Sequence, residues 1–124
     1  AHTKHPILYK YVKNEYLTPE QLAQVYIDSK ICLNINIEKH HSFNTRNFDV
    51  MVLSRLLITD EEDLTGIDVI PGEELVMSKG IEDMIERIGK YLRYDEERVK
   101  IAKKAGIKVK DKYCFSKTMK RILN

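Results

Sequence analysis

Residues His40 to Asp60, which read HHSFNTRNFDVMVLSRLLITD, carry the clearest pattern in the chain. It opens with a polar loop, continues into a short amphipathic segment and ends in an apolar run. A second apolar run, ICLNIN at positions 31–36, precedes the loop. A strand, a polar loop, a helix start and another strand form the layout of a small-molecule site at the edge of a parallel sheet.

Helix signals lie on both sides of this stretch. Thr18, Pro19 and Gln21 form a capping box with proline at the first helical position, which predicts a helix over 19–29. Ser78 is expected to cap a second helix. Its apolar residues recur every three or four positions and form one face: Ile81, Met84, Ile85, Ile88, Tyr91 and Leu92. Asp95 begins a third helix, whose other faces are rich in lysine.

Short apolar runs predict strands over 31–36, 56–59 and 75–77, with a further short strand over 68–70. The segment 7–12, ILYKYV, is expected to form a short or edge strand. Helices are predicted over 46–54 and from Ser116 onward. Alternating strands and helices indicate an α/β fold: a small three-layer, Rossmann-like parallel sheet with a helical C-terminal third.

The composition bounds the function. The chain has 124 residues, of which 43% are hydrophobic and 32% charged, and this composition suits one globular domain over 1–124. The net charge of +2 gives no electrostatic argument for a nucleic-acid partner. No apolar run reaches the roughly 18 residues of a transmembrane segment. Cys32 and Cys114 lack metal-ligand spacing, so we expect reduced thiols and a cytoplasmic protein.

The candidate substrate-binding residues lie where the loop meets the predicted helix. A helix starting near Asn44 or Thr45 leaves backbone N–H groups free to bind an anion, typically a phosphate. Ser42 adds a hydroxyl, Arg46 adds a guanidinium suited to phosphate oxygens, and Asp49 adds an acceptor for ribose hydroxyls. On the residues alone, a capped helix with solvated polar neighbours explains the same pattern and is the commoner arrangement.

Other polar clusters give weaker evidence for a binding site. His40 and His41 are adjacent, so their side chains diverge, and without a third ligand they predict no metal site. We interpret both as surface loop residues; the alternative is that one of them stacks on or hydrogen-bonds a ligand at the strand end. The acidic run 60–63 suits the first turn of a helix better than a cation site. No catalytic triad or glycine-rich phosphate loop is present, so the catalytic residues stay unassigned.

Several segments, in this order and spacing, resemble the group 1 glycosyltransferases of the spore-maturation-protein-like branch. The segments are 26–36 (YIDSKICLNIN), 42–49 (SFNTRNFD), 56–60 (LLITD), 71–76 (PGEELV) and 113–123. The resemblance covers nearly everything from Tyr11 onward. It implies the C-terminal, donor-binding domain of a GT-B glycosyltransferase, which takes a nucleotide-sugar as substrate and needs no further cofactor.

The resemblance also assigns roles to single residues. Asp49 occupies the place of a family glutamate that faces the nucleotide ribose, and it is shorter by one methylene. Arg46, with Asn44 and Thr45, would face the diphosphate. His41 stands where relatives carry the first glutamate of a pair, near the sugar. Leu53-Ser54-Arg55 replaces the small residue and glycine that often follow this helix in the family.

Two function classes follow. In the first, the chain is the donor-binding part of a glycosyltransferase; it lacks the acceptor-binding domain, so it is expected not to transfer sugar efficiently alone. In the second, it is a non-catalytic α/β interaction module in which an exposed sheet edge favours a homodimer or a partner strand. A nucleic-acid binder that uses the lysine-rich face is the weakest alternative.

Overall fold

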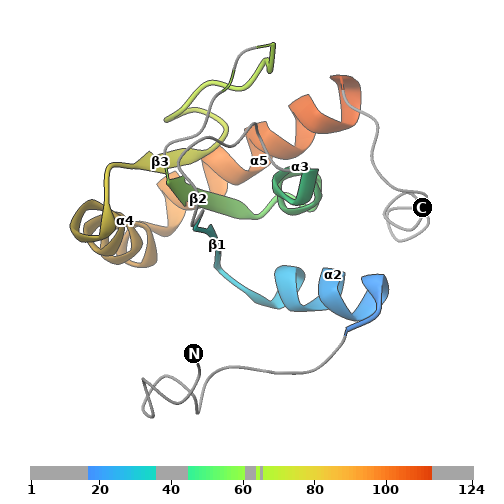
Figure 1. Ribbon diagram of the computed structural model, residues 1–124, viewed down its shortest axis with the longest axis horizontal. Coiled ribbons are helices and arrows are strands. Elements are labelled where there is room, and N and C mark those ends of the chain that lie inside the picture. The colour runs from blue at the N-terminus through green and yellow to red at the C-terminus, as the bar shows by residue number, and fades with distance from the viewer. Residues whose placement is uncertain (1–16, 36–44, 61–63, 65, 113–124) are drawn as a thin grey trace.

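The computed structural model describes residues 17–35, 45–60, 64 and 66–112, without the side chains of residues 45, 46 and 112 (Figure 1). Its elements, in chain order, are α2 (Pro19–Asp28), β1 (Ile31–Asn34), α3 (Thr45–Val52), β2 (Leu56–Asp60), β3 (Val76–Ser78), α4 (Ile81–Arg93) and α5 (Asp95–Lys112). The strands form one parallel sheet in the order β1-β2-β3. The predicted α/β fold with a helical C-terminal part is therefore confirmed.

Alternation along β2 separates the two apolar layers. Leu56 and Ile58 point to the face covered by α4, where they meet Met84 and Tyr91. Leu57 points to the opposite face, covered by α3. Figure 1 shows α4 and α3 on the two sides of the strands. Because β2 is buried on both faces, its run is continuously apolar rather than alternating.

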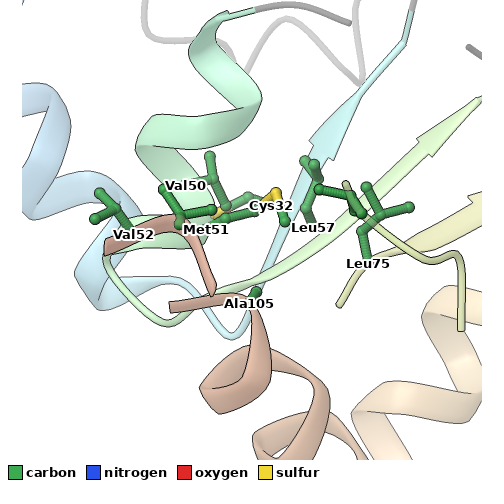
Figure 2. Close-up of a cluster of buried hydrophobic side chains, with 9 residues drawn as sticks. Cys32, Val50, Met51, Val52, Leu57, Leu75 and Ala105 are labelled. Carbon is green, nitrogen blue, oxygen red and sulfur yellow. The ribbon is translucent and has the colours of Figure 1, made fainter. Parts of the chain in front are cut away.

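Helix α5 joins these two layers. Its Ile101 belongs to the cluster beneath α4, whereas Ala105 and Val109 belong to the cluster beneath α3. Figure 2 shows the latter cluster, in which Met51 is fully buried. The N-terminal half of α5 lies beside Arg55 and Leu56, at the amino end of β2. Helix α5 is thus placed at the end of the sheet opposite the carboxyl ends of the strands.

The junction after α3 is a tight helix ending. The N–H of Ser54 donates to the carbonyl of Met51 at 2.9 Å, and the N–H of Arg55 donates to Val50 at 3.4 Å. This is the Schellman pattern, and Ser54 takes its left-handed position at φ 56°. Ser54 therefore adopts the conformation that glycine supplies more easily. Gly106 of α5 packs closely here, since a Cβ at Gly106 would lie 2.2 Å from the Ser54 Oγ.

The helix at 19–28 confirms its predicted capping box, because the backbone and side chains of Thr18 and Gln21 bond reciprocally. The strand predicted over 68–70 is wrong. The N–H groups of Glu73 and Glu74 both donate to the Ile70 carbonyl, and only Pro71 forms an isolated bridge, with Leu75. Proline has no N–H to give a ladder, so this segment is a turn.

The predicted cap of α4 is also wrong. Gly80, at φ 89°, is the N-cap and makes no side-chain cap bond. Ser78 is still in β3, where its hydroxyl donates to the Thr59 carbonyl at 3.5 Å. The predicted strand at 7–12, the acidic run at 61–63 and the helix from Ser116 lie outside the described residues.

Candidate functional site

The carboxyl edge of the sheet is the candidate site. Chain direction fixes what gathers there: β1 ends at Asn34, β2 at Asp60 and β3 at Ser78. The register sets Asn34 opposite Thr59 and Asp60 opposite Ser78, so the three ends are level. In open α/β sheets, ligands bind outside the carboxyl ends of the strands.

Two helices begin at this same edge. Only three residues separate the end of α3 from the start of β2, so the C-terminus of α3 lies at the amino edge of the sheet. Helix α3 has eight residues, about 12 Å of rise, which returns its first turn at Thr45 towards the carboxyl edge. Helix α4 starts there too, two residues after β3. Their free N–H groups favour an anion.

Polar side chains tie the strand ends together. The Asn34 amide donates to the Thr59 hydroxyl at 3.5 Å, and that hydroxyl donates to the Asp60 carbonyl at 3.2 Å. Thr59 is fully buried and Asn34 is half-buried. These two hydrogen bonds hold the polar groups of Asn34 and Thr59 at the carboxyl edge of the sheet.

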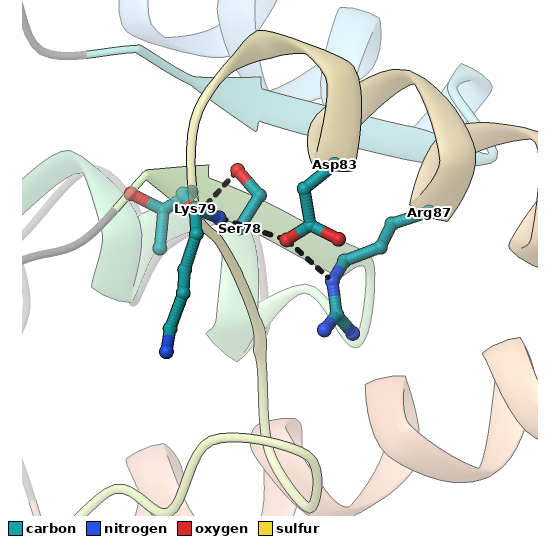
Figure 3. A network of polar contacts seen from close by, with 5 residues as sticks. Ser78, Lys79, Asp83 and Arg87 are labelled. Carbon is teal, nitrogen blue, oxygen red and sulfur yellow. Dashed lines mark hydrogen bonds and ion pairs between the residues drawn. The ribbon is translucent and has the colours of Figure 1, made fainter.

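The start of α4 is held by a carboxylate. Asp83 accepts from the Lys79 N–H at 2.8 Å and from the Arg87 Nε at 3.1 Å, as Figure 3 shows. The bond from the Lys79 backbone, followed by that from Arg87, lowers the pKa of Asp83. The charge of Asp83 thus stabilises the N-terminus of α4, the role that sequence reasoning gave to Ser78.

Asp49 is the one proposed site residue whose side chain the structure describes. It lies in the second turn of α3 and is half-buried, and this desolvation raises its pKa above the ordinary 3.8. Burial makes the charge of a carboxylate costly, and hydrogen bonds donated by a ligand would offset that cost. Ribose hydroxyls are donors of the right kind.

The remaining predicted residues divide into two groups. Thr45 and Arg46 occupy the first turn of α3, as the proposed anion site requires, while their side chains are outside the described part. His41, Ser42 and Asn44 lie outside the described residues altogether. Whether these residues approach Asp49 therefore stays a prediction.

Sequence reasoning missed the part that Asn47 plays. Its side chain is 1% exposed, within the first turn of α3. Asparagine buried at the start of a helix fixes that helix by polar contacts rather than by apolar packing. The only sequence signal was its position one helical turn before Val50 and Met51, on the face that enters the core.

Within the described residues, no group of three or more histidine, cysteine, aspartate or glutamate side chains is placed to hold a metal ion. Cys32 is a free thiol in the core, and burial raises its pKa to about 11. None of the described helices combines the length and the apolar content needed to cross a bilayer.

The geometry thus defines a Rossmann-like α/β domain whose candidate site lies at the carboxyl edge of the sheet. A family model described as glycosyl transferase-like matches residues 3–124, nearly the whole chain. The chain therefore belongs to this glycosyltransferase-like family. No match was found among curated proteins.

Proposed function

We propose that this chain binds the nucleotide-diphosphate-sugar donor of a GT-B glycosyltransferase at the carboxyl edge of its sheet. The observation that carries the proposal is Asp49, half-buried and with a raised pKa, one turn inside a helix that begins at this edge. Membership of the glycosyltransferase-like family supplies the class of ligand. We also propose that the chain belongs to the spore-maturation-protein-like branch of these enzymes and that it is cytoplasmic.

Each part of the donor meets a suitable group. The diphosphate takes the N–H groups of the first turn of α3, together with the guanidinium of Arg46. The ribose hydroxyls donate to Asp49. His41, Ser42, Asn44 and Thr45 complete the loop around the phosphates and the sugar.

Sugar transfer breaks the bond between the anomeric carbon and the diphosphate, and forms a bond from that carbon to an acceptor hydroxyl oxygen. Negative charge grows on the departing diphosphate. The α3 N-terminus and Arg46 stabilise that charge, which is the largest contribution such a domain makes. The acceptor and the group that takes its proton belong to a second domain, so this chain is proposed to be inactive alone.

An NMR titration with UDP, GDP and their sugar conjugates tests the proposal. We expect shifts in residues 40–49 and at the ends of β1 and β2, and their loss in Arg46→Ala. Arg93→Ala is the matched control, because Arg93 is an exposed arginine at the C-terminal end of α4, away from the carboxyl edge. No binding at millimolar nucleotide, or an equal loss in both variants, would contradict the proposal.

One observation favours the second candidate, a non-catalytic interaction module that forms a homodimer. Apolar side chains stand exposed along the β1 side of the molecule, among them Leu33, Ile35 and Ile85. A mass measurement across a concentration series separates the candidates, since the interaction module requires association and the donor-binding domain does not.

A further inference from the structure

A small pocket lined by basic side chains lies at the amino edge of the sheet, opposite the candidate site. It encloses about 240 Å³ between the end of α3 and the N-terminal half of α5. Among the described residues no carboxylate lines it, and its charged lining residues are Lys30, Arg55, Arg98 and Lys103. Lys30 immediately precedes β1 and Arg55 immediately precedes β2, so both come from the amino ends of neighbouring strands. We call this cavity the amino-edge pocket.

Arg55 brings a buried donor without an acceptor to the amino-edge pocket. The Arg55 Nε–H is shielded from solvent and has no hydrogen-bond partner among the described residues. No other buried side-chain nitrogen or oxygen in the described part of the chain is in this state. Buried donors are normally paired. A ligand that supplies an acceptor here therefore gains a hydrogen bond without displacing a partner within the protein.

Ordinary structural contacts explain the charge of Arg55 but not this donor. Arg55 follows the C-terminus of α3, and its backbone N–H donates to the Val50 carbonyl, so the helix dipole favours a cation here. Burial raises the pKa of Cys32 to about 11 and the charge of Arg55 opposes that rise, so the guanidinium lies near β1. Neither interaction supplies an acceptor to the Nε–H.

The other three cations differ in how much charge they leave free. Arg98 is bound through its Nη1 to the Asp95 carboxylate and, at 2.9 Å, to the Tyr91 carbonyl. Lys30 and Lys103 are exposed, and neither forms an ion pair within the described part of the chain. Arg55, Lys30 and Lys103 therefore give the pocket a positive potential that favours an anion.

We propose that the amino-edge pocket binds the phosphate group of a small soluble molecule. The planar guanidinium of Arg55, with its Nε–H, matches two phosphate oxygens, and Lys30 and Lys103 add ammonium charges. The volume of about 240 Å³ is below the roughly 300–1,000 Å³ of sites for drug-sized ligands, which suits one phosphate group better than a whole nucleotide. This site is separate from the proposed donor site, which lies at the opposite edge.

A soluble phosphate compound is favoured over a lipid headgroup. Asp95, Glu96 and Glu97, in the first turn of α5, are all exposed. This turn directly precedes Arg98, so an anionic bilayer that reached the pocket would also meet three carboxylates. A small phosphate compound contacts only the side chains that line the pocket.

An NMR titration of the complete chain with inorganic phosphate, at an ionic strength held constant with chloride, tests the inference. The Arg55 Nε–H resonance should shift and saturate, together with backbone amides of residues 98–103. Arg55→Lys keeps the charge but lacks the Nε–H and the planar fork, so it should weaken phosphate binding roughly tenfold. Absence of a saturable shift at tens of millimolar phosphate would overturn the inference.

Two double variants separate the pocket from general attraction to positive charge. Lys30→Ala with Lys103→Ala should weaken phosphate binding roughly threefold to tenfold. The matched control is Lys100→Ala with Lys104→Ala, which removes the same charge from exposed positions that line a different cavity. The control should bind phosphate as the parent does. Equal losses in the two double variants would refute a built site.

Two further results distinguish this site from its alternatives. Arg46→Ala, which tests the proposed donor site, should leave the shift of the Arg55 Nε–H unchanged, and loss of that shift would overturn the inference. Sedimentation with phosphatidylglycerol vesicles, compared with phosphatidylcholine vesicles, tests the lipid source. Binding to the anionic vesicles without binding of inorganic phosphate would also overturn it.

Discussion

The contact between Gly106 and Ser54 sets how closely α5 approaches the end of α3, and Gly106→Ala perturbs it. Alanine in a helix interior gains about 1 kcal/mol over glycine. The new Cβ would lie 2.2 Å from the Ser54 Oγ and 3.3 Å from its Cβ, so α3 or the serine must move. Overpacking of this kind costs about 1–3 kcal/mol. We therefore expect Gly106→Ala to be neutral or destabilising by up to about 2 kcal/mol.

Gly89→Ala is the matched control, because Gly89 is also helical and a Cβ there meets nothing within 4 Å. It should stabilise the chain by about 1 kcal/mol, so the two alanine variants differ by the cost of the clash. Ser54→Gly removes the clashing atoms and suits φ 56°. In that background, Gly106→Ala should behave like Gly89→Ala.

Urea unfolding of the two single variants and the double variant gives the coupling energy. We expect about 1–3 kcal/mol, equal to the relieved clash. Additivity within about 0.5 kcal/mol would refute the close packing of α5 on the end of α3.

Three further changes test the scaffold. Asp83→Asn should lower the melting temperature at pH 7, because it removes the charge that accepts from Lys79 and Arg87. The pKa of Asp83 in the folded chain lies below 3.8, so the difference in melting temperature between variant and parent should disappear as the pH drops below 3.8. Lys108→Ala should destabilise the chain more than Lys104→Ala, because Lys108 bonds at 2.6 Å to the carboxylate of Glu74, which is 4% exposed. Thr18→Ala should cost about 1 kcal/mol in urea unfolding by removing the capping box of α2.

Local signals in the sequence predicted much of the fold. The capping box at Thr18 and the buried run at 56–59 each depend on neighbouring residues, and both predictions were confirmed. The strand at 68–70 failed because two apolar residues, Val69 and Ile70, do not distinguish a strand from a turn closed by Pro71. The sequence predicted one apolar face on α4 but not how much of it is buried: Met84 and Tyr91 are buried, whereas Ile85 is exposed, because burial depends on distant chain segments.

Only part of the candidate site could be predicted from the sequence. The strand–loop–helix order placed Thr45, Arg46 and Asp49 in one short helix, as observed. The Gly80 cap and the hydrogen bond from the Lys79 N–H to Asp83 were not predictable, because they depend on the backbone conformation of the two residues between β3 and α4. Serine at 78 has the right chemistry for a cap but is still part of the strand.

We propose that Asp49 binds the donor through a charge that its burial makes costly, and the variant Asp49→Asn separates these two effects. Burial raises the pKa of Asp49 above 3.8, so its ionised form destabilises the fold as pH rises through the interval between 3.8 and that raised value. Asp49→Asn should therefore raise the melting temperature at pH 7 and leave it unchanged well below pH 3.8.

The same variant should bind nucleotide more weakly. Hydrogen bonds from ribose hydroxyls to a carboxylate contribute about 1.5–3 kcal/mol, so calorimetry should give roughly a tenfold to hundredfold loss of affinity for UDP or GDP. A more stable variant with weaker binding is the predicted result. Unchanged affinity in a variant that folds at least as well as the parent would contradict the account.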